Sequence, residues 1–99
     1  MRQGIMIDHV SIAVRDLRAA DAFYGALLAP LGFAKLREWP DAAIGFGKKH
    51  PEFWLNKRSA MQEVAQDSGV HICLRAPDPA AVERLVVEVS RAAREGRAA

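Results

Sequence analysis

The feature that most constrains this chain is a short segment that occurs twice. The two copies begin at His9 and at His71 and read HVSIAVRD and HICLRAPD. In each copy a histidine comes first, an aspartate follows seven positions later, and a helical pattern begins after the aspartate. An offset of 62 residues also aligns the apolar positions of the two helical patterns, as a duplicated strand–helix unit would. The sequence therefore predicts an internal repeat.

Composition indicates one small globular domain. The chain has 99 residues, of which 51% are hydrophobic and 26% are charged. No apolar run reaches the roughly 20 residues of a membrane span, and the first residues do not resemble a signal peptide. The single cysteine, Cys73, fits a cytoplasmic protein. The net charge is only +2, with cations scattered among anions, so neither nucleic acid nor membrane is expected as a partner.

The first half of the chain predicts a β-α-β-β-β order. Ile5–Val14 alternates as a strand, and Asp16 is placed to cap the helix that follows. Pro30 and Gly32 should end that helix. Three further strands are expected at Phe33–Trp39, Ala42–Lys48 and Glu52–Asn56. Gly45 and Gly47 should weaken the middle one or admit a ligand close to its backbone.

The second half predicts a strand and a helix only. Residues 58–68 are polar and aperiodic, as in a linker between a first module (1–57) and a partial second module (69–99). Val70–Ala76 alternates as a strand, and Asp78-Pro79 is a strong helix start. The buried stripe of this helix is expected to contain Val82, Leu85, Val86, Val89 and Ala93. Because the sequence stops there, the chain is expected to be a fragment or to be completed by a partner chain.

The alternation of the two predicted strands assigns their side chains to opposite faces. One face should pack under the helices, and it contains Val10, Ile12, Val14, Val70, Ile72 and Leu74. The other face should line a cleft, and it contains His9, Ser11, His71, Cys73 and Arg75.

The chain resembles the vicinal oxygen chelate superfamily, which holds glyoxalase I, bleomycin-resistance proteins and extradiol dioxygenases. The matching segments are IDHVSIAVRD at 7–16, the helix from Ala22-Phe23-Tyr24 to Pro30-Leu31-Gly32-Phe33, and GVHI at 69–72. The resemblance implies an α+β fold in which paired β-α-β-β-β modules enclose a metal-binding cleft.

The resemblance further implies that His9 and His71 match the leading metal ligands of the two modules. Neutral imidazoles suit divalent zinc, nickel, iron or manganese. Two departures stand against a complete site. Trp54 occupies the position where metal-dependent members carry a carboxylate, so that Glu52 is the nearest substitute and the candidate general base. The second module also stops three strands short, without the strand that supplies the last carboxylate.

Two functions remain open at this stage. The first is a metal-dependent lyase, isomerase or dioxygenase. The second is a protein that sequesters a flat ligand, as bleomycin-resistance proteins do, with Trp54 as a wall that stacks on it. Ser11, Cys73 and Arg75 are candidate ligand-binding residues, and Arg75 could pair with an anionic group. Trp39 is interpreted as packing near a turn and His50 as incidental. A homodimer is expected because an unfinished sheet exposes an edge.

Overall fold

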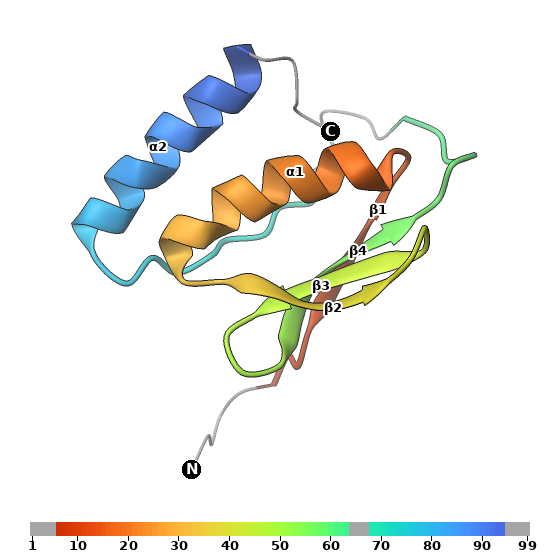
Figure 1. Cartoon of the computed structure of the whole chain (residues 1–99), viewed down its shortest axis with the longest axis horizontal. Helices are drawn as coiled ribbons and strands as arrows, with labels where there is room; N and C mark the ends of the chain where they lie inside the picture. The colour runs from red at the N-terminus through yellow and green to blue at the C-terminus, as the bar shows by residue number, and fades with distance from the viewer. Residues whose placement is uncertain (1–5, 64–67, 95–99) are drawn as a thin grey trace.

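The computed structural model describes residues 6–63 and 68–94, and the side chains of 92–94 lie outside the described part. The fold is α+β, with one four-stranded mixed sheet and two helices (Figure 1). In chain order the elements are β1 (Val10–Val14), α1 (Leu17–Leu28), η1 (Ala29–Leu31), β2 (Ala34–Trp39), β3 (Ala43–Gly47), β4 (Pro51–Lys57) and α2 (Pro79–Arg94).

The sheet has the strand order β1-β4-β3-β2. β2, β3 and β4 form an antiparallel meander, and β1 joins β4 in parallel with Val10 opposite Phe53. A parallel pair needs a long crossover, which α1 provides. The predicted β-α-β-β-β order is therefore confirmed. β1 is shorter than expected, because its pairing with β4 starts only at Val10, and Ile5 lies outside the described residues.

The limits of α1 follow from local signals. The backbone N–H of Ala19 donates to the Asp16 carboxylate at 3.0 Å, so Asp16 is the N-cap that the sequence predicts. Pro30 lies in the short 3₁₀ turn η1. Gly32 then ends the turn with a φ of +86°, in the left-handed region that glycine adopts without steric cost.

The core lies between α1 and one face of the sheet. Phe46 and Leu55 supply its centre from the sheet, and Leu28 supplies it from the helix, each less than 2% exposed. Val10, Ile12 and Leu74 are partly buried against this core, and Val14 belongs to it. Four of the six residues predicted to pack under the helices therefore do so.

The second copy of the repeat departs from the prediction. Val70–Ala76 forms no strand, although all seven residues are described. Val70 is 81% exposed and Ile72 43% exposed, so the prediction that they pack under the helices is wrong. A strand is held by ladder hydrogen bonds to a neighbour. β1 has β4 beside it, whereas no described strand pairs with 70–76.

α2 begins where the sequence predicts, but its predicted stripe is mostly uncovered. The helix packs chiefly on α1 and η1, where Ala81 is fully buried and Leu85 partly buried. Val82, Val86 and Val89 stay 40–57% exposed, and the side chain of Ala93 lies outside the described part. The stripe is predicted from apolar spacing alone, which does not say whether another layer covers it. Figure 1 shows α2 beside α1 and away from the strands.

Among the described residues, no helix combines the length and hydropathy that crossing a bilayer requires.

Candidate functional site

The face of the sheet opposite α1 is built from small residues and tryptophans. Because side chains alternate along a strand, the residues between the core positions point to this face. The register places Ser11 of β1 beside Trp54 of β4 and Trp54 beside Gly45 of β3. Trp39 of β2 lies beside Ala43 of β3 in the same way. Two strands that each carry a tryptophan thus flank a central strand that has no bulky side chain on this face.

The two indole rings meet above this central strand. Trp39 and Trp54 stack with their centroids 5.1 Å apart and their planes 11° from parallel. A methyl group added at Gly45 would lie 3.0 Å from two ring atoms of Trp54. The sequence predicts that Gly45 weakens its strand or lets a ligand approach the backbone. In the structure the group that approaches Gly45 closely is the indole of Trp54. Trp39 is 57% exposed, which leaves an apolar platform at the surface.

This platform belongs to a groove of about 480 Å³, here called the tryptophan groove. Its lining is made by Asp8, His9, Ser11, Trp39, Ala43, His50, Pro51 and Trp54. The groove thus combines two stacked indoles with one carboxylate, two imidazoles and one hydroxyl. Apolar walls with a few polar groups are typical of small-molecule sites.

Asp8 is the charged centre of the groove. Its Oδ2 atom lies 2.9 Å from Nδ1 of His9, and its Oδ1 atom lies 3.5 Å from Nε2 of His50. The hydrogen bond from His9 is the main cause that lowers the pKa of Asp8 from its usual value of 3.8, and the nearby His50 adds to it. Asp8 therefore carries a full negative charge at neutral pH.

Ser11 is oriented by Asn56 of the neighbouring strand. The side-chain amide of Asn56 donates to Oγ of Ser11 at 2.7 Å and to the Ile12 carbonyl at 3.0 Å. Since the Ser11 oxygen already accepts from Asn56, its own O–H is directed elsewhere. Ser11 thus presents a hydrogen-bond donor at the edge of the groove.

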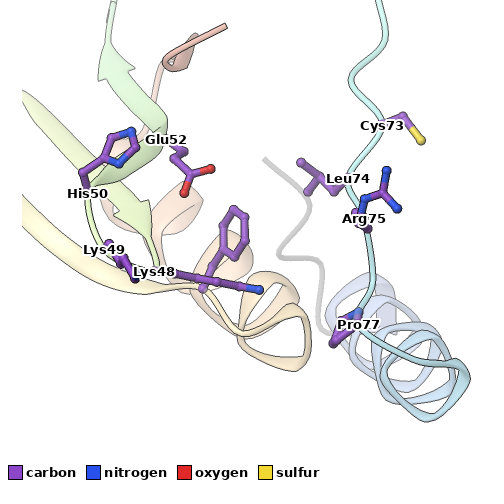
Figure 2. Close-up of a pocket in the computed structure, with 9 residues that line it drawn as sticks. Lys48, Lys49, His50, Glu52, Cys73, Leu74, Arg75 and Pro77 are labelled. Atoms are coloured by element: carbon purple, nitrogen blue, oxygen red, sulfur yellow. The ribbon is translucent and has the colours of Figure 1, made fainter. Parts of the chain in front are cut away.

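A second cavity, of about 590 Å³, lies between the β3–β4 turn and the extended segment 73–77. Glu52, Cys73 and Arg75 line it together with Phe33, Leu74, Pro77 and the turn residues Lys48, Lys49 and His50. Figure 2 shows Glu52 and Lys48 reaching from the strand side toward the segment that carries Leu74 and Arg75.

The structure thus divides the predicted site residues between two places. His9, Ser11 and Trp54 lie in the tryptophan groove, whereas Glu52, Cys73 and Arg75 line the second cavity. His71 is exposed on the extended segment and lines neither. The prediction that both histidines share one cleft depended on a strand at 70–76, and that strand is absent from the described residues.

Four residues of the site were not singled out from the sequence. Asp8 and Asn56 lie in the predicted strands Ile5–Val14 and Glu52–Asn56, but no motif or spacing marks either one as a site residue. His50 was interpreted as incidental, yet it lines both cavities and lies close to Asp8. Trp39 is interpreted as packing from the sequence. The signal that could have indicated the stack is that Trp39 and Trp54 lie on the same face of the sheet, on the two strands that flank β3 and its small residue Gly45.

The donor set for a metal does not assemble in the described part of the chain. No three His, Cys, Asp or Glu side chains within residues 6–63 and 68–94 lie close enough together to hold an ion. His9 has Asp8 beside it, but His71 is not in the groove. Within the described residues, His9 and His71 are therefore not brought together in one site.

Comparison with known proteins adds no family. The sequence matches no model of a protein family, and no curated protein matches it.

Proposed function

We propose that this chain binds a flat aromatic small molecule, neutral or positively charged, in the tryptophan groove. The observation that carries the proposal is the stacked pair of Trp39 and Trp54 beside the exposed carboxylate of Asp8. This is the ligand-sequestering function that the resemblance to bleomycin-resistance proteins implies.

The chemistry of the groove sets the preferred ligand. Indole faces carry negative charge density and attract cations as well as other rings, with cation–π energies of about 0.5–2 kcal/mol. Asp8 adds a formal negative charge next to them. The Ser11 hydroxyl can donate to an acceptor atom on the ligand, because Asn56 occupies its oxygen. A planar cation with one hydrogen-bond acceptor matches all three groups.

N-Methylquinolinium, a small planar cation, tests the proposal, and quinoline at pH 8 is its uncharged counterpart. The two tryptophan indole N–H resonances in an ¹H–¹⁵N spectrum should shift saturably with either compound, more tightly with the cation. Trp54→Ala should weaken both by about 5- to 150-fold, the effect of removing a stacking partner worth about 1–3 kcal/mol. Asp8→Asn should weaken only the cation, by about two- to fivefold, as for an exposed ion pair.

Asp21→Asn is the matched control for Asp8→Asn, because Asp21 is a carboxylate on α1 that pairs with Lys35 outside the groove. It should leave both affinities unchanged. Absence of saturable shifts at either indole, or equal binding by the parent and Trp54→Ala, would overturn the proposal.

A metal-dependent lyase, isomerase or dioxygenase is the second candidate, and the position of His9 favours it. His9 lines the groove where the resemblance places the first metal ligand. A metal held there would act as a Lewis acid on paired oxygens of the substrate. Asp8 and His50 border the same groove, but no three such side chains within the described residues lie close enough together to hold an ion, so a complete ligand set would need further groups. Stoichiometric zinc or nickel that survives dialysis and is lost on His9→Ala or His71→Ala would support this candidate.

A homodimer is part of the proposal. The exposed aliphatic side chains of α2 and of segment 70–72 support it, because uncovered apolar surface favours association. Light scattering at micromolar concentration should give twice the monomer mass, and a clean monomer would remove this component without affecting the ligand test.

A further inference from the structure

The second cavity differs in charge from the tryptophan groove. Lys48 and Lys49 face it from the β3–β4 turn, and Arg75 faces it from the extended segment. Among the described residues that line it, Glu52 is the only carboxylate. The formal charge of this lining is therefore about +2 with His50 neutral, whereas the groove is negative. We call this second cavity the basic cavity.

The charges of the basic cavity are not neutralised by one another. Lys48, Lys49, Glu52 and Arg75 make no ion pair within the described residues. Lys48 instead extends past Gly32, with its ammonium 5.9 Å from the ring centre of Phe33. Three cations that gather around one hollow raise the local positive potential and attract an anion.

Besides His50 and Cys73, the remaining described residues of the lining are apolar. Phe33 and Leu74 are partly buried and pack against the core, and Pro77 closes the end next to α2. An inorganic ion gains nothing from contact with these apolar side chains. An organic anion would bury its hydrocarbon part against them and so remove it from water. The cavity thus offers a cationic rim and an apolar floor to one ligand.

We propose that the basic cavity binds a small organic anion, a carboxylate or phosphate monoester with an apolar or aromatic part. The guanidinium of Arg75 suits bidentate binding of either anionic group, and Lys48 and Lys49 add point charges. Glu52 can accept a hydrogen bond from a hydroxyl or amine where the ligand carries one. The site is independent of the tryptophan groove, although His50 borders both.

The test titrates the full chain with three probes and follows its backbone amide resonances in ¹H–¹⁵N spectra. The probes are phenyl phosphate, inorganic phosphate and benzyl alcohol. Phenyl phosphate should shift amides of residues 48–52 and 73–77 saturably, and weaker binding is expected for inorganic phosphate and benzyl alcohol. Benzoate distinguishes carboxylate from phosphate preference. Arg75→Gln should weaken phenyl phosphate by about two- to fivefold, and Lys48→Gln with Arg75→Gln by about tenfold. Added salt should weaken it further.

Arg15→Gln is the matched control, since Arg15 is exposed, lies outside the cavity and changes the net charge equally. It should leave the affinity within about twofold, and Trp54→Ala should do the same. Because all three basic side chains are exposed, these variants should remain folded, as an unchanged amide spectrum would show. Binding that ignores Arg75→Gln and Lys48→Gln, shifts confined to other residues, or equal affinity for inorganic phosphate would overturn the proposal.

Discussion

The two copies of the repeat, residues 9–16 and 71–78, start from nearly the same pattern and end in different structures. In the first copy Val10–Val14 is a strand in the sheet, and the helix after it covers the core. In the second copy residues 71–76 form no pairing in the described part, and four valines of the following helix remain exposed. The difference lies in the neighbours of each copy, because β2, β3 and β4 surround only the first.

The two copies agree wherever the interaction is local. Asp16 accepts a hydrogen bond from the N–H of Ala19, and Asp78 accepts one from the N–H of Ala81 at 2.8 Å. Both helices begin at the residue after their aspartate. A cap needs only residues three positions apart, whereas a strand needs a partner far along the chain. Helix starts are therefore conserved between the copies and strand formation is not.

The largest expected effect on stability comes from the core that α1 covers in the first copy, compared with the exposed face of α2 in the second. Phe46→Ala should lower the free energy of unfolding by about 3–5 kcal/mol, because Phe46 is 1% exposed and its loss leaves a cavity under α1. Val87→Ala, at a 62% exposed position of α2, should change it by less than about 0.5 kcal/mol. Urea unfolding of both variants measures the contrast, and similar losses would show that α2 is buried in solution.

A smaller contrast compares equivalent strand positions, since Val10 and Ile72 are related by the repeat. Val10→Ala should destabilise the protein by about 1 kcal/mol, because Val10 is partly buried against the core. Ile72→Ala should cost less than about 0.5 kcal/mol, although it removes more hydrocarbon. Chemical denaturation at several protein concentrations checks this. A large, concentration-dependent loss for Ile72→Ala would mean that a second chain covers the segment.

Removing either capping aspartate should destabilise the start of its own helix, but only the loss of Asp16 should lower the stability of the whole protein. Removing a capping aspartate costs a helix about 0.5–2 kcal/mol. Asp16→Ala should therefore lower global stability by about 1 kcal/mol, because α1 covers the sheet. Asp78→Ala should mainly speed amide hydrogen exchange in the first turn of α2 and leave the unfolding midpoint nearly unchanged. Equal shifts of the midpoint would show that α2 unfolds together with the core.

The smallest effect concerns Tyr24, whose counterpart in the second copy is the exposed Val86. Burial raises the pKa of Tyr24 above its usual value of 10.0. The unfolded chain therefore loses this proton first as pH rises past about 10, so the stabilising contribution present below that pH is lost at higher pH. Tyr24→Phe should lessen the alkaline decline in melting temperature relative to the parent. An identical decline in both proteins would contradict the burial of this hydroxyl.

The sequence contained enough to predict the local structure and one side of the groove. Asp16, Pro30 and Gly32 fix the limits of α1 through interactions within a few residues. Alternation in β1 correctly separates Val14 on the core side from Ser11 on the groove side. The meeting of Trp39 and Trp54 depends instead on the register of two strands with β3, including the bulge between Lys35 and Arg37. Such a register is set by the whole sheet and cannot be deduced from neighbouring residues.

The parallel pairing of β1 with β4 has a consequence for the order of folding. β2, β3 and β4 are joined by short turns, so this meander can close early at little entropic cost. We expect β1 to pair with β4 last, because α1, β2 and β3 separate these two strands along the chain. His9 and Ser11 would then reach Trp54 in this last step. A chain trapped before that step would already have β3 paired with β4, yet its groove would lack His9 and Ser11.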